Sequence, residues 1–172
     1  MQLVQAGLSS NKLSFIDLKN NILIKFLNIS NNRIRTVDLS NNTQLAELDL
    51  SSNLLDFLDI TKNTALVEMN LSRNNLITID LSNNTSLRRC TIDSNRIIVL
   101  DLTKNTELSY LSLAENQIVI INLKKNINII ELNLYKNRIP SIDLLNQVNL
   151  QILNVSNNAL DNLNIKNSKK IS

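Results

Sequence analysis

Apolar and polar positions along this chain repeat with a period of 21 residues. Asn11 opens a series of asparagines that continues at this spacing to Asn158 without a gap or an insertion. When each repeat is started eight residues before its asparagine, the first, fourth, sixth, eleventh, fourteenth and sixteenth positions are apolar. All 48 such sites in the eight repeats are apolar, although only 43% of the chain is hydrophobic. The chain is therefore an array of eight equal repeats.

The repeats, called coils 1 to 8 below, start at Leu3, Ile24, Leu45, Leu66, Leu87, Leu108, Ile129 and Leu150. Their first half reads L-x-x-L-x-L-x-x-N-x-L, which matches the leucine-rich-repeat signature. The second half nearly repeats it as L-x-x-L-D-L-x-x-N, so the chain resembles the short, nested bacterial-type leucine-rich repeats. The resemblance covers Leu3 to Lys170. We expect a single domain at residues 3–170 and a tail at 171–172.

Each half of a coil has two apolar positions separated by one polar position. This period of two predicts a short strand with one buried face in each half. Two strands in 21 residues leave no room for a helix of about ten residues. The predicted fold is a mainly β leucine-rich-repeat solenoid of eight coils with parallel stacked sheets and no regular helix. The inward side chains stack between coils, since no coil has a core of its own.

Asparagine is the most unusual part of the composition, with 31 of 172 residues, whereas glycine and proline occur once each. We expect asparagine to turn the chain, because its side chain bonds to nearby backbone and tolerates left-handed conformations. The first asparagine column is predicted to be a ladder whose amides pair with backbone groups of their own coil and the next one. Its members are Asn11, Asn32, Asn53, Asn74, Asn95, Asn116, Asn137 and Asn158.

A second column, from Asn21 to Asn126, is interrupted by Gln147 and Ser168. This interruption predicts a looser edge in the last two coils.

Residues suited to catalysis or to cofactor binding are scarce. The chain has no histidine, which removes the commonest general base and metal ligand. Cys90 occupies an inward position, and a single glycine cannot form a phosphate-binding loop. We therefore expect no enzyme activity, no cofactor and no metal.

The charge pattern limits the kinds of partner that we expect. The net charge is +3, and no run of basic residues occurs before the lysines near the end of the chain, so nucleic acid is not an expected partner. No apolar run reaches the length of a membrane span and no signal peptide is evident, so we expect no membrane association and a cytoplasmic location by default.

The outward positions of the first strand differ from coil to coil, and the family resemblance implies that this face binds the ligand. Tyr110 and Tyr135 are expected to be exposed beside Arg89 and Glu131, a composition typical of an interface hot spot. An ordinary solvated sheet face with aromatic cross-strand pairs is an equal alternative. The candidate protein-binding residues are Phe26, Glu47, Asp49, Glu68, Arg89, Tyr110, Glu131, Tyr135 and Ile152.

The outward residue of the second half is aspartate in six coils. We call Asp17, Asp38, Asp59, Asp80, Asp101 and Asp143 the Asp row. Stacked carboxylates repel one another, so their recurrence needs a cause. They either accept hydrogen bonds from turn backbone and neighbouring side chains or hold a column of calcium ions. We favour hydrogen bonding, because nearby lysines supply counter-charge.

The sequence therefore favours a non-catalytic scaffold that presents the first-strand face to a protein ligand of unknown identity. The alternative is a structural or self-assembling fragment of a longer repeat array. Neither end of the chain resembles the polar cap that solenoids normally need, so self-association through the ends is an expected possibility.

Overall fold

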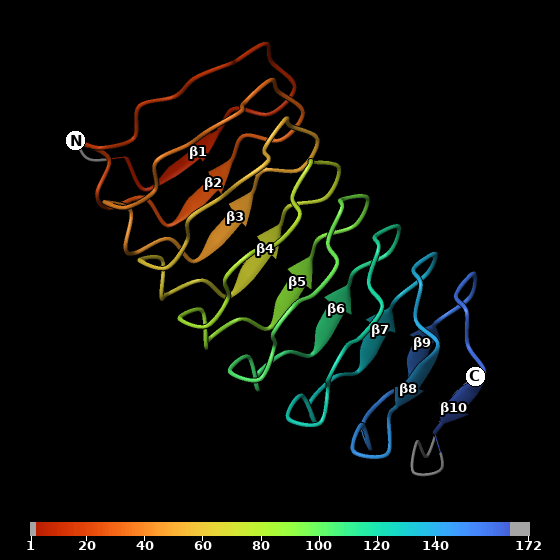
Figure 1. Cartoon of the computed structure of the whole chain (residues 1–172). Helices are drawn as coiled ribbons and strands as arrows, with labels where there is room; N and C mark the ends of the chain where they lie inside the picture. Colours follow the sequence, from red (N-terminus) through yellow and green to blue (C-terminus); the bar gives the residue numbers. More distant parts are fainter. Residues whose placement is uncertain (1–2, 166–172) are drawn as a thin grey trace.

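Parallel strands, one from each coil, run side by side along one flank of the molecule. The structure is a computed structural model that describes residues 3–165. Figure 1 shows the coils stacked into a solenoid, with the strands forming one sheet in chain order. Its members are β1 (Gln5–Gly7), β2 (Phe26–Asn28), β3 (Glu47–Asp49), β4 (Glu68–Asn70), β5 (Arg89–Thr91), β6 (Tyr110–Ser112), β7 (Glu131–Asn133) and β9 (Ile152–Asn154). The predicted solenoid of parallel stacked strands is confirmed.

The pairing register of this sheet equals the sequence period. Glu47 of β3 pairs with Glu68 of β4, and Leu48 pairs with Met69. The middle residue of each strand points inward and its neighbours point outward, since successive side chains of a strand alternate between the two faces. Each column of the sequence pattern thereby becomes a straight row along the solenoid.

The second halves of the coils differ from the expectation. Regular strands form there only in the last two coils, as β8 (Ser141–Asp143) and β10 (Asn162–Asn164), which pair in parallel. In the earlier coils, neighbouring second halves are joined by isolated backbone bonds, such as that from Leu54 N–H to Ile34 O at 2.9 Å. Local turns occupy the adjacent backbone groups, so no continuous ladder forms. The prediction of a strand in every second half was therefore wrong for coils 1 to 6.

The core consists entirely of residues from the six apolar columns. Side chains such as Leu50, Ile60 and Leu71 are completely or almost completely buried. The exceptions gather in the first and last coils, where Leu3 and Leu163 are exposed. Among residues 3–165 there is no helix long and apolar enough to cross a membrane.

The first asparagine column forms the ladder that turns the chain after each strand. The Asn53 amide donates to Leu50 O in its own coil at 3.1 Å and to Ile29 O in the preceding coil at 2.9 Å. Its Oδ1 accepts a hydrogen bond from Ile34 N–H at 3.0 Å, again in the preceding coil. The same pattern recurs from Asn32 to Asn137. The ladder asparagines therefore bond to the preceding coil, whereas the sequence analysis expected bonds to the next coil.

The left-handed residue of this turn is not the ladder asparagine. It is the residue directly before it, with φ between 53° and 56° in all eight coils. Asparagine occupies that position only at Asn31 and Asn157, whereas Arg73, Glu115 and Lys136 stand there in other coils. The expectation that asparagine supplies the left-handed conformation was therefore wrong in most coils. Ladder asparagines turn the chain through hydrogen bonds.

The second asparagine column closes the opposite corner with a different set of bonds. Asn84 donates to Ile60 O at 3.1 Å and to Asn63 O at 2.9 Å. Gln147 takes the same place in coil 7, is completely buried and donates to Leu123 O at 2.6 Å. Gln147 therefore keeps its burial but makes one of the two bonds of the column, and Ser168 lies outside the described residues.

Candidate interaction surface

The first residues of the strands form a continuous row on the outward face of the sheet. We call this row, together with the outward residues at the strand ends, the first-strand face. The strand register places Glu47, Glu68, Arg89 and Tyr110 side by side in successive coils. Phe26 precedes them, Glu131 and Ile152 follow them, and Asp49 lies at the end of β3.

Arg89 contacts both Glu68 and Tyr110, and we call these three residues the Arg89 cluster. Arg89 Nε lies 3.7 Å from Glu68 Oε1, and the Arg89 guanidinium carbon lies 4.3 Å from the centroid of the Tyr110 ring. A cation over an aromatic face at an exposed site contributes about 0.5–1 kcal/mol, and an exposed ion pair contributes little. The cluster therefore adds little stability, but it places a planar cation over an aromatic ring.

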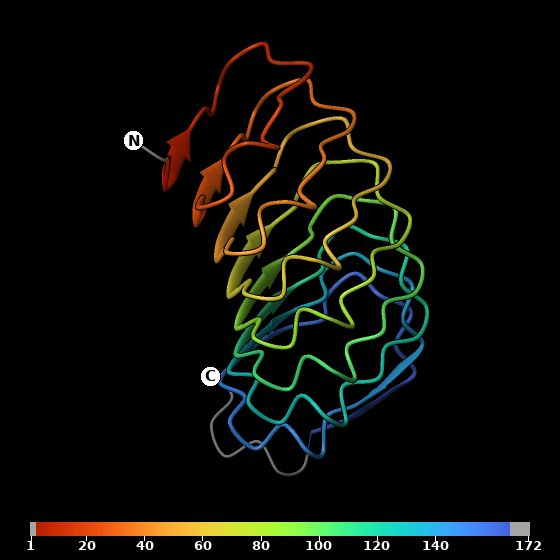
Figure 2. The same cartoon turned by 90° about the vertical axis from the view of Figure 1, so that its left-hand side faces the viewer.

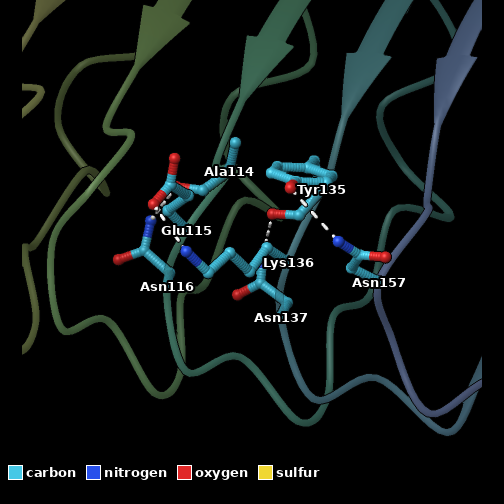
Figure 3. Close-up of polar contacts among 7 residues, drawn as sticks. All are labelled: Ala114, Glu115, Asn116, Tyr135, Lys136, Asn137 and Asn157. Carbon is cyan, nitrogen blue, oxygen red and sulfur yellow. Dashed lines mark hydrogen bonds and ion pairs between the residues drawn. The ribbon is translucent and has the colours of Figure 1, made fainter.

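The two tyrosines are half-buried rather than exposed, because each packs against neighbouring coils. Tyr135 lies beyond the end of β7, and its hydroxyl oxygen accepts a hydrogen bond from Asn157 Nδ2 at 3.1 Å (Figure 3). Lys136 and Glu115 form an ion pair of 3.1 Å at the same corner, and this hydrogen bond raises the pKa of Lys136. Tyr135 therefore belongs to the corner beside the sheet, whereas Tyr110 belongs to the row of strand residues.

A hollow of about 620 Å³ lies over strands β1 to β4. Phe26 lines it together with the carboxylates of Glu47, Asp49 and Glu68. The hollow is open at coil 1, because Gly7 has no side chain and a Cβ built there meets nothing within 4 Å. The sequence analysis identified Phe26, Glu47, Asp49 and Glu68 as outward, but it did not predict that they line one hollow.

Asp93 is a further polar residue of this face that the sequence analysis did not select. Its Oδ1 accepts hydrogen bonds from Ser112 Oγ and from Ala114 N–H, both at 2.7 Å. Burial raises the pKa of the Asp93 carboxyl, and Glu115 adds to the effect. The only signal in the sequence is that aspartate replaces the serine found at this position in five other coils.

The Asp row lies at the second corner, where its members accept hydrogen bonds from turn backbone. Asp59 Oδ1 accepts from Thr61 N–H at 2.9 Å and from Thr61 Oγ1 at 2.7 Å. Asp38 and Asp80 accept in the same way from the N–H two residues later. These bonds lower the pKa of five members, Asp17 to Asp101. The expected hydrogen bonds from turn backbone to the row are therefore present. Within residues 3–165, no group of three or more metal-ligating side chains comes together.

Comparisons with solved structures identify related folds. The functional domain of InlJ from Listeria monocytogenes is 25% identical with a TM-score of 0.76, and the match covers 99% of this chain and 45% of that one. The internalin InlF from Listeria monocytogenes is 27% identical with a TM-score of 0.81, covering 88% and 51%. A chain of the LRIM1/APL1C complex is 27% identical with a TM-score of 0.70, covering 86% and 28%. No family model and no curated protein sequence matches the chain.

These neighbours are leucine-rich-repeat proteins, and the present chain spans about half the length of the first solved chains that it matches. The shared architecture supports a protein-interaction scaffold in general terms. It does not assign a ligand or a face.

Proposed function

We propose that this chain, a leucine-rich-repeat solenoid, is a non-catalytic scaffold that binds a protein ligand on its first-strand face. The outward strand residues differ from coil to coil, while the core columns and ladders are nearly invariant along the chain. Variation at the exposed positions of this face supports recognition there, because packing does not require it. One solved neighbour, LRIM1/APL1C, is itself a protein complex.

The Arg89 cluster is the observation that carries this proposal. Interface hot spots are rich in tyrosine and arginine, and they bind best when little side-chain freedom is lost on docking. Tyr110 is half-buried and covered by the Arg89 guanidinium, which is held in turn by Glu68. A partner that meets this cluster finds its aromatic and cationic groups already in contact.

The hollow over β1 to β4 extends the proposed surface away from the cluster. It combines the exposed Phe26 ring with three carboxylates, so it suits an apolar side chain flanked by basic groups. Together with Glu131, Tyr135 and Ile152, these residues make up the proposed binding set.

The test compares Tyr110→Ala/Tyr135→Ala with the wild type as immobilised baits in an extract of the source organism. Truncated hot-spot aromatics typically cost about 2 kcal/mol or more in binding free energy, so a ligand of this face should be lost from the double variant. Thr78→Ala, on the opposite flank, is the matched control and should retain it. A ligand kept by the double variant but lost from Thr78→Ala would overturn the assignment of the face.

Self-association through the coil faces is the second candidate. The exposure of Leu3 and Leu163, which occupy core columns in coils 1 and 8, favours it. Light scattering over a concentration series separates the candidates, because a monomer at all concentrations contradicts self-association.

A further inference from the structure

A second apolar surface lies on the flank opposite the sheet. The thirteenth coil position carries Phe15, Phe57, Val99 and Ile120, and these four residues define the outer stripe. Their exposed fractions are 71%, 67%, 62% and 71%. Figure 2 shows the irregular halves of the coils on the side of the solenoid away from the strands, which is where these positions lie.

Phe15, Phe57 and Val99 of the outer stripe are joined by hollows of the surface, although threonines separate them in the sequence of coils. Ile77, Ile98 and Val119, one position earlier in their coils, are also exposed and widen it. Two hollows of about 510 and 530 Å³ run along it and share Phe57 as a wall. Single exposed apolar residues are ordinary, but a contiguous patch marks an interaction site.

The fold does not require apolar residues at these positions. Thr36 and Thr78 stand at the thirteenth position of the coils on either side of Phe57, and Ser141 stands there in coil 7. The neighbouring inward residues Leu58 and Ile79 are buried whether the outward residue is phenylalanine or threonine. The phenylalanines therefore add nothing that the solenoid needs.

The Asp row runs directly beside the outer stripe and lines the same hollows. Apart from the 3.2 Å contact of Asp17 with Lys19, no member forms an ion pair within residues 3–165. Asp38, Asp59 and Asp80 are exposed, and hydrogen bonds lower the pKa of each, so they are ionised at neutral pH. An apolar strip with a negative edge complements an apolar strip with a positive edge.

The spacing of the coils selects the shape of the occupant. Stacked coils repeat at roughly 4.8 Å. The turns of an α-helix repeat at about 5.4 Å, whereas same-face residues of a strand repeat at about 6.7 Å. A helix lying along the solenoid axis therefore keeps nearly in step with both rows. From Phe15 to Ile120 the stripe spans roughly 24 Å, or about 16 helical residues.

We propose that the outer stripe and the Asp row together dock an amphipathic helix with a lysine- or arginine-rich edge. Its apolar residues enter the hollows around Phe57, and its basic residues face Asp38, Asp59 and Asp80. A second copy of the described part of the chain is a poor occupant, because residues 3–165 contain no helix. An anionic membrane surface is repelled by the same carboxylates.

The test uses a fluorescent helical peptide of about 16 residues, with leucines at helical spacing on one face and lysines along one edge of that face. Anisotropy should show saturable binding to the wild type, although the protein carries a net charge of +3. Phe57→Thr should weaken binding at least tenfold, and Asp59→Asn/Asp80→Asn should weaken it and reduce its salt dependence. Phe57→Thr introduces the residue of both neighbouring coils, so its fold is expected to be intact. Tyr110→Ala, on the first-strand face, should bind like the wild type.

Three results would overturn the proposal. The first is that the wild type and Phe57→Thr bind the peptide with equal affinity. The second is that the wild type binds a peptide with glutamates in place of the lysines equally well. The third is that the wild type is a dimer and that Phe57→Thr is a monomer. The last would assign the stripe to self-association. Sedimentation of the unliganded wild type and of Phe57→Thr detects it.

Discussion

The two corners of each coil both use buried asparagines, but they use them differently. At the first corner, the Asn95 amide donates to Leu71 O at 3.0 Å and to Ile92 O at 3.2 Å, and its Oδ1 accepts from Leu76 N–H at 3.0 Å. At the second corner, Asn84 uses its amide group fully, but its buried Oδ1 accepts no hydrogen bond from any group of residues 3–165. The side-chain oxygen likewise accepts no hydrogen bond in five further members of that column, which are Asn42, Asn63, Asn105, Asn126 and Gln147.

The difference shows that burial and repetition do not by themselves measure how much a side chain stabilises a fold. A buried carbonyl without a donor has lost its hydration without compensation, which offsets part of what the amide group contributes. The first corner should therefore be the stronger one, although its asparagines are slightly more exposed than those of the second.

Asn95→Ala should have the largest effect. It leaves the buried Leu76 N–H without an acceptor, which costs about 1–3 kcal/mol. It also removes one of the two donors to Leu71 O and to Ile92 O, which keep the bonds from Asn74 and Asn116. We expect a loss of about 3 kcal/mol in the free energy of unfolding, measured by urea denaturation. Asn41→Ala is the control, because the Asn41 amide makes one exposed bond of 3.3 Å, and it should cost under about 0.5 kcal/mol. Equal losses would contradict the ladder.

Asn84→Ala should cost less, about 1–2 kcal/mol, because it removes the unpaired Oδ1 together with the two amide bonds. The measurement is the same denaturation series, with Asn95→Ala as the reference. A loss as large as that of Asn95→Ala would show that the Asn84 carbonyl is satisfied in solution, and the contrast between the corners would then disappear.

Ser94→Ile tests the backbone of the first corner. Ser94 has a φ of 53°, and a left-handed conformation costs an L-residue about 1–2 kcal/mol, most for a β-branched one. We expect Ser94→Ile to destabilise the protein by about 1 kcal/mol and Ser94→Asn to be neutral. Ser86→Ile, at an exposed site without a positive φ, is the matched control. A loss at Ser86→Ile equal to that at Ser94→Ile would assign the effect to the isoleucine side chain.

The sequence predicted those features of the fold that every coil repeats. The period, the inward columns and the ladder follow from one residue type recurring at one position. The left-handed position has no such signal, because serine, asparagine, arginine, glutamate and lysine all occur there. Its conformation is imposed by the bonds of the asparagine that follows it.

Features that depend on contacts between particular neighbouring residues could not be predicted from the sequence either. The burial of Tyr110 depends on Arg89 in the preceding coil. The thirteenth coil position alternates between phenylalanine and threonine in the first coils, so it does not form an apolar column in the sequence. The outer stripe became evident only from the exposure of its apolar residues in the structure.

The carboxylates of the two corners provide the most sensitive comparison, because their pKa values are shifted in opposite directions. Burial raises the pKa of Asp93 at the first corner, whereas hydrogen bonds from Ser82 lower that of Asp80 at the second. A raised folded pKa favours the protonated native state, so the Asp93 contribution to stability should increase as the pH falls from 7 towards 4. A lowered folded pKa makes the Asp80 contribution fully present above about pH 4 and lost as the pH falls further.

Asp93→Asn and Asp80→Asn remove each titration while preserving shape, so the pH dependence of the difference from the wild type isolates each group. Between pH 7 and pH 4, the wild type should gain stability relative to Asp93→Asn in urea denaturation and stay constant relative to Asp80→Asn. Below pH 4, it should lose stability relative to Asp80→Asn. Both effects should be small, because neither carboxyl is fully removed from water and solvent screens its interactions. If the stability difference from the wild type follows the same pH profile for both variants, the two corners shift the pKa of a carboxyl in the same way, and the comparison fails. Opposite slopes would show that the first corner shields its carboxyl from water more than the second corner does.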